Sequence, residues 1–270
     1  MEDVVDMYQK LDALRTKIDL CAVTPLFSQE IQSRTNRYAE TVARENNNLL
    51  RVMASLIAYS NNAPSDAVAA ILESGVFERV FFHFDIRTVA RMNPDWIIEN
   101  NWGAIRDIRF KKKVGAIITC AKLLASNRNS NISIETFFDN YNLPKELATE
   151  DDINRFWQQY DYLLAGFIVM DMPYFKNDTA LLHLLLYLGF PCIKPDLIVM
   201  KVAAAIGLID SRKDYTLCSL KERKSVVRTV QEYCCSRKIK PEVMDLYLLI
   251  FGGQNYARRY VSDGYVPLTL

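Results

Sequence analysis

The chain has 270 residues, half of them apolar, and a formal net charge of +1. This balance excludes a bulk electrostatic attraction to nucleic acid, so any contact with DNA has to come from a local positive patch. Charged residues interrupt every apolar stretch and the N-terminus is acidic and amphipathic, so we expect neither a membrane span nor a signal peptide. The six cysteines follow no secretory pattern, which favours reduced thiols and a cytoplasmic location.

Apolar side chains recur at helical spacing over most of the chain, which holds only nine glycines and nine prolines. We therefore expect an all-α protein. An amphipathic helix is expected over residues 3–20 and is ended by Pro25, after which Ser28 is expected to cap a second helix. The apolar run at residues 49–58 predicts a buried helix, and a polar break over residues 59–66 precedes the next one.

The densest positive cluster of the chain opens a helix that we expect over residues 109–124. It contains Arg109, Lys111, Lys112 and Lys113. Side chains in such a run neutralise phosphates when they face nucleic acid. A solvated helix face is the alternative, but positive charge that is concentrated in a nearly neutral chain favours DNA binding.

Aromatic residues gather on a helix expected over residues 151–170. Phe156, Trp157, Tyr160 and Tyr162 all belong to this cluster. Two interpretations are open for them and for Trp102. They stack on an extruded base, or they pack in the core, which is the more frequent use of such side chains.

The central stretch of the chain runs over residues 172–208. A proline-led turn opens a helix at Thr179 that ends at Gly189, and Pro195 and Asp196 begin another helix. The helix dipole stabilises a carboxylate in the first turn. An aspartate at a helix start is common without catalysis, so its context has to decide its role. His183 lies among leucines and is expected to be a core histidine and not a metal ligand.

This stretch resembles the helix-hairpin-helix DNA glycosylase superfamily. Members carry a Leu-Pro-Gly-apolar-Gly hairpin, a Thr-Ala pair, a buried helix ending in glycine, and a catalytic aspartate that starts the next helix. Tyr174 and Lys176 replace the hairpin glycines. Asp178 stands where bifunctional members keep a lysine nucleophile, so no AP-lyase activity is implied. The matching positions are Met172, Pro173, Phe175, Thr179, Ala180, Gly189 and Asp196.

A second resemblance covers residues 77–125, which are similar to bacterial 3-methyladenine DNA glycosylase I. That family recognises its base with a glutamate in the preceding helix, but residues 49–60 hold no acidic residue. The cysteine and histidine residues of its zinc site and the four cysteines of iron–sulfur glycosylases are also missing. The matching positions are Phe84, Asp85, Val89, Ala90, Met92, Gly103, Ile105, Arg106 and Lys112.

The resemblance implies an all-α, two-lobed glycosylase fold with a central cleft. Residues 1–48 and 166–270 would form the lobe with the hairpin and Asp196, and residues 49–165 the central lobe. Asp196 would stabilise positive charge on the deoxyribose and orient a water. The implied DNA contacts are Tyr174, Phe175, Lys176, Asn177, Thr179, Asn61, Asn62, Arg109, Lys111 and Lys112, and the implied base pocket is Trp102, Trp157 and Tyr160. For Asn61 and Asn62, a helix cap and loop without DNA is an open alternative.

We therefore expect a monomeric DNA glycosylase that cleaves the N-glycosidic bond of a flipped-out modified base in double-stranded DNA. No cofactor, metal or membrane is implied. The substrate would be an alkylated base or a bulky modified pyrimidine such as those of virus genomes, the latter in antiviral defence. Two other classes stay open: a non-catalytic DNA-binding module that retains the fold, and a helical scaffold for protein partners.

Overall fold

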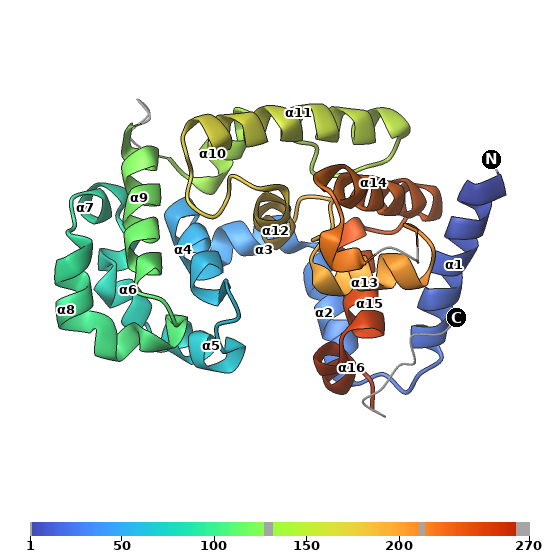
Figure 1. The fold of residues 1–270 in the computed structure, drawn as a ribbon, viewed down its shortest axis with the longest axis horizontal. Helices are drawn as coiled ribbons and strands as arrows, with labels where there is room; N and C mark the ends of the chain where they lie inside the picture. Colours follow the sequence, from blue (N-terminus) through green and yellow to red (C-terminus); the bar gives the residue numbers. More distant parts are fainter. Residues whose placement is uncertain (1, 127–131, 211–213, 263–270) are drawn as a thin grey trace. The chain divides into compact units, whose positions relative to one another are not determined.

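The computed structural model describes residues 2–126, 132–210 and 214–262. Within these ranges the chain is all-α, as predicted, with sixteen α-helices, three short 3₁₀ helices and no strand (Figure 1). None of the described helices combines the length and the apolar character that crossing a membrane requires.

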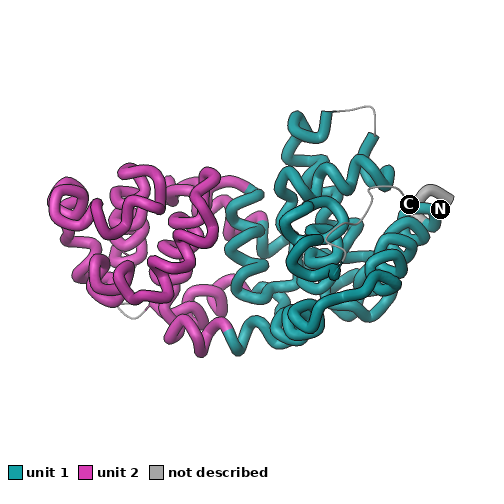
Figure 2. The backbone as a smooth tube through the Cα atoms, turned by 90° about the horizontal axis from the view of Figure 1, so that it is seen from below, with its two compact units in different colours: residues 1–40, 143–160, 178–270 teal, residues 41–142, 161–177 magenta. Residues whose placement is uncertain are grey.

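The chain divides into two compact units, each assembled from separate stretches of sequence (Figure 2). Unit 1 comprises residues 1–40, 143–160 and 178–270, and unit 2 comprises residues 41–142 and 161–177. The hairpin at residues 172–177 therefore belongs to unit 2, whereas Asp196 belongs to unit 1. The glycosylase-type lobes expected from the sequence stay a prediction.

Unit 1 is built around helix α15 (Pro241–Gly252). Every residue of α15 up to Phe251 is buried, because the helix packs against five others, α1, α2, α13, α14 and α16. The helices of this unit are α1 (Glu2–Asp19), α2 (Pro25–Thr35), α12 (Asp178–Leu188), α13 (Leu197–Ala205), η3 (Tyr215–Leu217), α14 (Leu220–Arg237), α15 and α16 (Gln254–Tyr260).

Unit 2 is built around α4 (Leu49–Tyr59) and α9 (Lys112–Ser126), which pack against each other. The apolar run that predicted α4 is buried. The other helices are α5 (Ser65–Glu73), α6 (Val76–Val80), η1 (Phe82–Phe84), α7 (Ile86–Ala90), α8 (Pro94–Ile105), η2 (Arg106–Ile108) and α10 (Ile134–Asp139). Two helices, α3 (Arg37–Arg44) and α11 (Glu150–Val169), are divided between the units.

Two expected helix starts are wrong. Helix α2 begins at Pro25, so Ser28 lies inside it and is not its cap. A proline suits a first helical position, where its missing N–H has no partner to lose. Helix α9 begins at Lys112, because Arg109 has φ 77°, outside the helical region. The sequence also did not predict α16, and the tail at residues 263–270, expected to be irregular, lies outside the described residues.

The helix ends around the central stretch are confirmed. Gly189 follows α12 with φ 85°, and a Cβ atom there would lie 2.4 Å from the backbone nitrogen of Tyr38. Both the conformation and the close approach therefore require glycine. Asp196 is the N-cap residue of α13, and its Oδ1 accepts hydrogen bonds from the N–H groups of Ile198 at 3.0 Å and Val199 at 3.2 Å.

Candidate nucleic-acid interface

A tight turn at Asn61 and Asn62 follows the end of α4 in unit 2. Their φ values are 54° and 56°, and the N–H of Ala63 donates to the carbonyl oxygen of Ser60 at 3.4 Å. This is the pattern of a type I′ turn, where asparagine is favoured because it tolerates left-handed backbone. Both asparagines are exposed, so the turn presents two amide groups on the surface.

A buried lysine stabilises the start of this turn. Lys113 is fully buried, and its Nζ donates to the carbonyl oxygens of Ala58 at 2.8 Å and Ser60 at 2.6 Å. These carbonyl groups end α4, where the helix itself supplies no N–H partner. Burial, with the charges of Arg109 and Lys112 nearby, lowers the pKa of Lys113 to about 8. Lys113 is thus a C-terminal cap of α4 that fixes where the turn begins.

Arg109 also stabilises the turn through hydrogen bonds. Its Nη1 donates to the carbonyl oxygens of Asn61 at 3.4 Å and Asn62 at 2.9 Å. Arg109 itself is exposed. The guanidinium has further N–H donors in its fork, so it can brace the turn and still meet an anion.

The predicted hairpin reaches the same turn. Tyr174 has φ 67°, and the N–H of Phe175 donates to the carbonyl oxygen of Pro173 at 2.9 Å. This is a γ-turn with positive φ at its centre, which is strained for a residue with a side chain. Glycine, which the resemblance places at this position, adopts it freely. The hydroxyl of Tyr174 accepts a hydrogen bond from Nδ2 of Asn61 at 3.3 Å, so hairpin and turn form one surface.

The remaining hairpin residues differ in exposure. Phe175 is buried, which leaves it no surface to offer DNA. Lys176 is exposed and forms an ion pair with Asp171. Asn177 is exposed, and its Nδ2 donates to the carbonyl oxygen of Tyr174 at 2.8 Å. Lys176 and Asn177 are therefore the hairpin side chains that can reach a phosphate.

Exposed cations and aromatic rings continue this surface. The Nζ atom of Lys111 lies 5.8 Å from the ring centroid of Trp102 on α8. Arg109 and Lys112 lie over the ring of Phe110, at 5.2 Å and 5.5 Å. Trp102 is partly exposed, so it can stack with a partner. We call the residues Asn61, Asn62, Trp102, Arg109, Lys111, Lys112 and Tyr174 the Asn61 cluster.

Asp196 lies in unit 1, in different surroundings. Its side chain is 25 % exposed, and Oδ2 faces the Nζ atom of Lys194 at 3.5 Å. Arg223, which the sequence did not single out, donates from Nη1 to Oγ1 of Thr179 at 3.3 Å and to the carbonyl oxygen of Pro195 at 3.1 Å. Arg223 thus ties the start of α12 to the segment that carries Asp196.

A cavity of about 100 Å³ adjoins Asp196. A water molecule occupies about 30 Å³ in the liquid, so a cavity of this volume has room for a few waters. Burial, with Lys194 and Arg37 nearby, lowers the pKa of His183 to about 3, which leaves its imidazole neutral. The lining residues are Arg34, Arg37, His183, Leu186, Tyr187, Lys194, Asp196, Asp245, Leu249 and Tyr256.

Two buried charged residues, Arg34 and Asp245, line this cavity. Arg34 donates to Oδ2 of Asp245 at 2.9 Å and to Oε1 of Glu30 at 2.8 Å. The other carboxylate oxygen of Asp245 accepts from the N–H of Lys194 at 3.1 Å. Both Arg34 and Asp245 are buried. The network therefore fixes the backbone two residues before Asp196.

Trp157 and Tyr160 lie in the core of unit 1. Trp157 is 8 % exposed and Tyr160 is fully buried. Trp157 donates from Nε1 to Oε1 of Gln231 at 2.8 Å, and the hydroxyl of Tyr160 donates to Oδ1 of Asp178 at 2.8 Å. Core packing, the alternative left open by the sequence, accounts for both rings, so neither is available to the base pocket that the resemblance implied.

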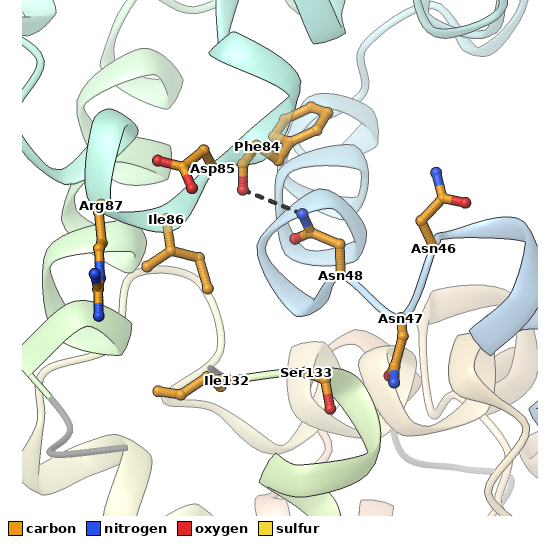
Figure 3. Close-up of a pocket in the computed structure, with 9 residues that line it drawn as sticks. All are labelled: Asn46, Asn47, Asn48, Phe84, Asp85, Ile86, Arg87, Ile132 and Ser133. Carbon is orange, nitrogen blue, oxygen red and sulfur yellow. Dashed lines mark hydrogen bonds between the residues drawn. The ribbon is translucent and has the colours of Figure 1, made fainter. Parts of the chain in front are cut away.

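A polar cavity of about 330 Å³ in unit 2 was not predicted (Figure 3). Figure 3 shows the side chain of Asn48 directed at the carbonyl oxygen of Phe84, to which its Nδ2 donates at 3.1 Å. Asn46 and Asn47 beside it have φ 52° and 53°, so a left-handed pair also precedes α4. The lining residues are Asn46, Asn47, Asn48, Phe84, Asp85, Ile86, Arg87, Ile132 and Ser133.

Comparisons of the chain with protein-family models, with curated proteins and with solved structures find no match. Over the described ranges, no group of three or more histidine, cysteine or acidic residues is arranged to hold a metal ion.

Proposed function

We propose that this protein is a monofunctional DNA glycosylase of the helix-hairpin-helix type, with Asp196 as its catalytic carboxylate. The observation that carries the proposal is the meeting of distant segments in the Asn61 cluster. Tyr174 contacts Asn61, and Arg109 contacts both Asn61 and Asn62. Tyr174 and Arg109 belong to the two separate stretches that carry the resemblances, and both hydrogen-bond to Asn61, so this shared partner supports a common role in DNA binding.

The chemistry of the cluster suits duplex DNA. Arg109, Lys111 and Lys112 are exposed and can neutralise phosphates. The amides of Asn61 and Asn62 can hydrogen-bond base edges, and Trp102 offers a stacking surface. This local charge provides the attraction that the net charge of +1 does not.

Asp196 is suited to the chemical step. Loss of the base leaves positive charge on the sugar, which a nearby carboxylate stabilises. Two N–H groups fix Oδ1 of Asp196, while Oδ2 is not used in the cap. A carboxylate held in one orientation stabilises developing charge without rearranging during the reaction. No metal or cofactor enters the proposal.

Incubation of the protein with genomic DNAs of different modification content, followed by scoring of abasic sites, tests this proposal. We expect release from alkylated DNA, which would indicate repair, or from DNA with bulky modified pyrimidines, which would indicate antiviral defence. Asp196→Asn should slow release by about 10²-fold or more. Asparagine is also a good N-cap, so folding and DNA binding should persist. Release as fast as that of the parent would remove Asp196 from the mechanism.

A second candidate is a DNA-binding module without catalysis. The small cavity beside Asp196 and the use of its Oδ1 as a helix cap favour this candidate. It predicts that the protein binds duplex DNA and that substitutions in the Asn61 cluster weaken binding. No DNA in the panel would then yield abasic sites.

A further inference from the structure

Unit 1 contains a larger cavity that the proposed function does not use. Its volume is about 340 Å³, within the range of pockets that bind small organic molecules. Three segments enclose it: the loop before α11, the residue Pro191, and the connection from α14 to α15. We call it the α14–α15 cavity. Its lining residues are Lys145, Glu146, Leu147, Ala148, Pro191, Cys235, Lys238, Ile239, Lys240, Pro241 and Glu242.

The walls of this cavity are fixed by the backbone. Lys238 ends α14 in the left-handed conformation with φ 55°, and its N–H donates to carbonyl oxygens at the helix end. The N–H of Ile239 donates to the carbonyl oxygen of Cys234 at 2.9 Å. Pro241 then begins α15, and Pro191 faces the cavity with its own rigid ring. The cavity is thus formed before any ligand arrives, which lowers the entropic cost of binding.

The cavity combines apolar walls with lysines. Lys240 donates from Nζ to the carbonyl oxygen of Thr35 at 2.7 Å and lies 3.6 Å from Oε1 of Glu146. Lys145 lies over the ring of Tyr38 at 4.2 Å. Lys238 is exposed and has no ion-pair partner among the described residues. At least one lysine is therefore available to a negatively charged ligand.

Glu242 cancels only part of this positive charge at neutral pH. Its side chain is buried, and Oε2 has no hydrogen-bond partner in the described part of the chain. Burial raises the pKa of Glu242 to about 7. A substantial part of the population is then uncharged near pH 7, and the three lysines of the lining outnumber its two carboxylates, Glu146 and Glu242.

We propose that the α14–α15 cavity binds a small organic anion, whose apolar body contacts Leu147, Pro191 and Ile239 and whose charged group faces Lys238. The ligand needs an apolar part, because Leu147, Ala148, Pro191, Ile239 and Pro241 contribute apolar side chains to the lining. It also needs a carboxylate, sulfonate or phosphate, since a lysine binds such groups as a point charge. This site does not depend on DNA binding or on Asp196.

Titration of the intact protein with the fluorescent anion anilinonaphthalene sulfonate tests the site. We expect saturable binding of one molecule per chain. Lys238→Glu should weaken this binding about tenfold, the equivalent of about 1.4 kcal/mol, while binding of the uncharged analogue phenylnaphthylamine stays unchanged. Ala148→Trp should block both probes by filling the cavity. Lys221→Glu, an exposed change at the other end of α14, is the matched control.

Circular dichroism of each variant separates a lost site from a lost fold. The proposal is overturned if the sulfonate does not saturate at one molecule per chain. It is equally overturned if folded Lys238→Glu or folded Ala148→Trp binds it as tightly as the parent. If one of the two variants does not fold, the other decides.

Discussion

The Asn61 cluster of unit 2 and the surroundings of Asp196 in unit 1 use charge in opposite ways. In the cluster, Lys111 and Lys112 are exposed and form no ion pair among the described residues. Near Asp196, Arg34 is buried and is committed to Glu30 and Asp245. Charge on Lys111 and Lys112 is therefore available to a partner, whereas charge on Arg34 near Asp196 holds the chain together. Substitutions should separate these two uses.

The largest expected effect is on stability in unit 1. Asp245→Ala leaves the guanidinium of Arg34 buried without this carboxylate, which should lower the free energy of unfolding by about 3–5 kcal/mol. Urea unfolding followed by circular dichroism measures the change. Asp6→Ala removes the exposed ion pair with Lys10 and is the control, with less than about 1 kcal/mol expected. Equal losses in the two variants would contradict the contrast between buried and exposed charge.

A pH-dependent effect should follow from Glu242. Burial raises its pKa from 4.5 to about 7, so the folded protein binds a proton that the unfolded chain releases above pH 4.5. This contribution to stability is complete below pH 4.5 and is lost as pH rises through 7. The loss amounts to about 3 kcal/mol at most.

Glu242→Gln removes this titration and keeps the shape of the side chain. The variant should therefore become more stable relative to the parent between pH 5 and pH 8, and the difference should level off above pH 8. Thermal unfolding at a series of pH values measures it. A difference that stays constant across this range would show that Glu242 titrates normally.

A smaller effect is expected in unit 2, where Lys113 and Lys112 are neighbours with opposite environments. Lys113→Met leaves two carbonyl groups at the end of α4 without this donor, which should cost about 1–3 kcal/mol. Lys112→Met changes an exposed side chain and should stay within about 0.5 kcal/mol. Urea unfolding of both variants tests the contrast. A neutral Lys113→Met would mean that the turn does not need this cap.

The smallest expected effect is on DNA affinity and its dependence on salt. Lys112→Met should remove about one phosphate contact, so the slope of log affinity against log salt should fall by about one. Fluorescence anisotropy with a labelled duplex at several salt concentrations measures the slope. Lys221→Met on α14 is the control. An unchanged slope for Lys112→Met would remove this residue from the interface.

Local patterns were the predictable part of this structure. The apolar run of α4, the glycine after α12 and the aspartate before α13 each depend on neighbours in sequence, and all three predictions are confirmed. The ion pair of Arg34 and Asp245 joins residues 211 positions apart, and the sequence around either residue does not predict it. An ion pair between residues so far apart in sequence can be identified only from the three-dimensional structure.

Lys113 shows what could have been predicted but was not. It belongs to a positive run, and the sequence analysis grouped it with its exposed neighbours Lys111 and Lys112. Ile117, Cys120 and Leu124 follow it at helical spacing and are buried, so the period of α9 places Lys113 on the inner face. Tyr174 is the opposite case, because a tyrosine gives no signal for positive φ. Only the resemblance, which has glycine there, pointed to that conformation.

A pair of asparagines with left-handed backbone lies at each end of α4, Asn46 and Asn47 before it and Asn61 and Asn62 after it. The length of α4 therefore sets the distance and the rotation between the two pairs. Its 11 residues set Asn48 and Ser60 apart by about 1.5 Å per residue and rotate them by about 100° per residue. One inserted residue would rotate the Asn61 turn by about 100° around the helix axis. We expect this rotation to break the hydrogen bonds of the turn with Arg109 and Tyr174. Sequences that share this architecture should therefore tolerate exchanges within α4 far better than changes in its length.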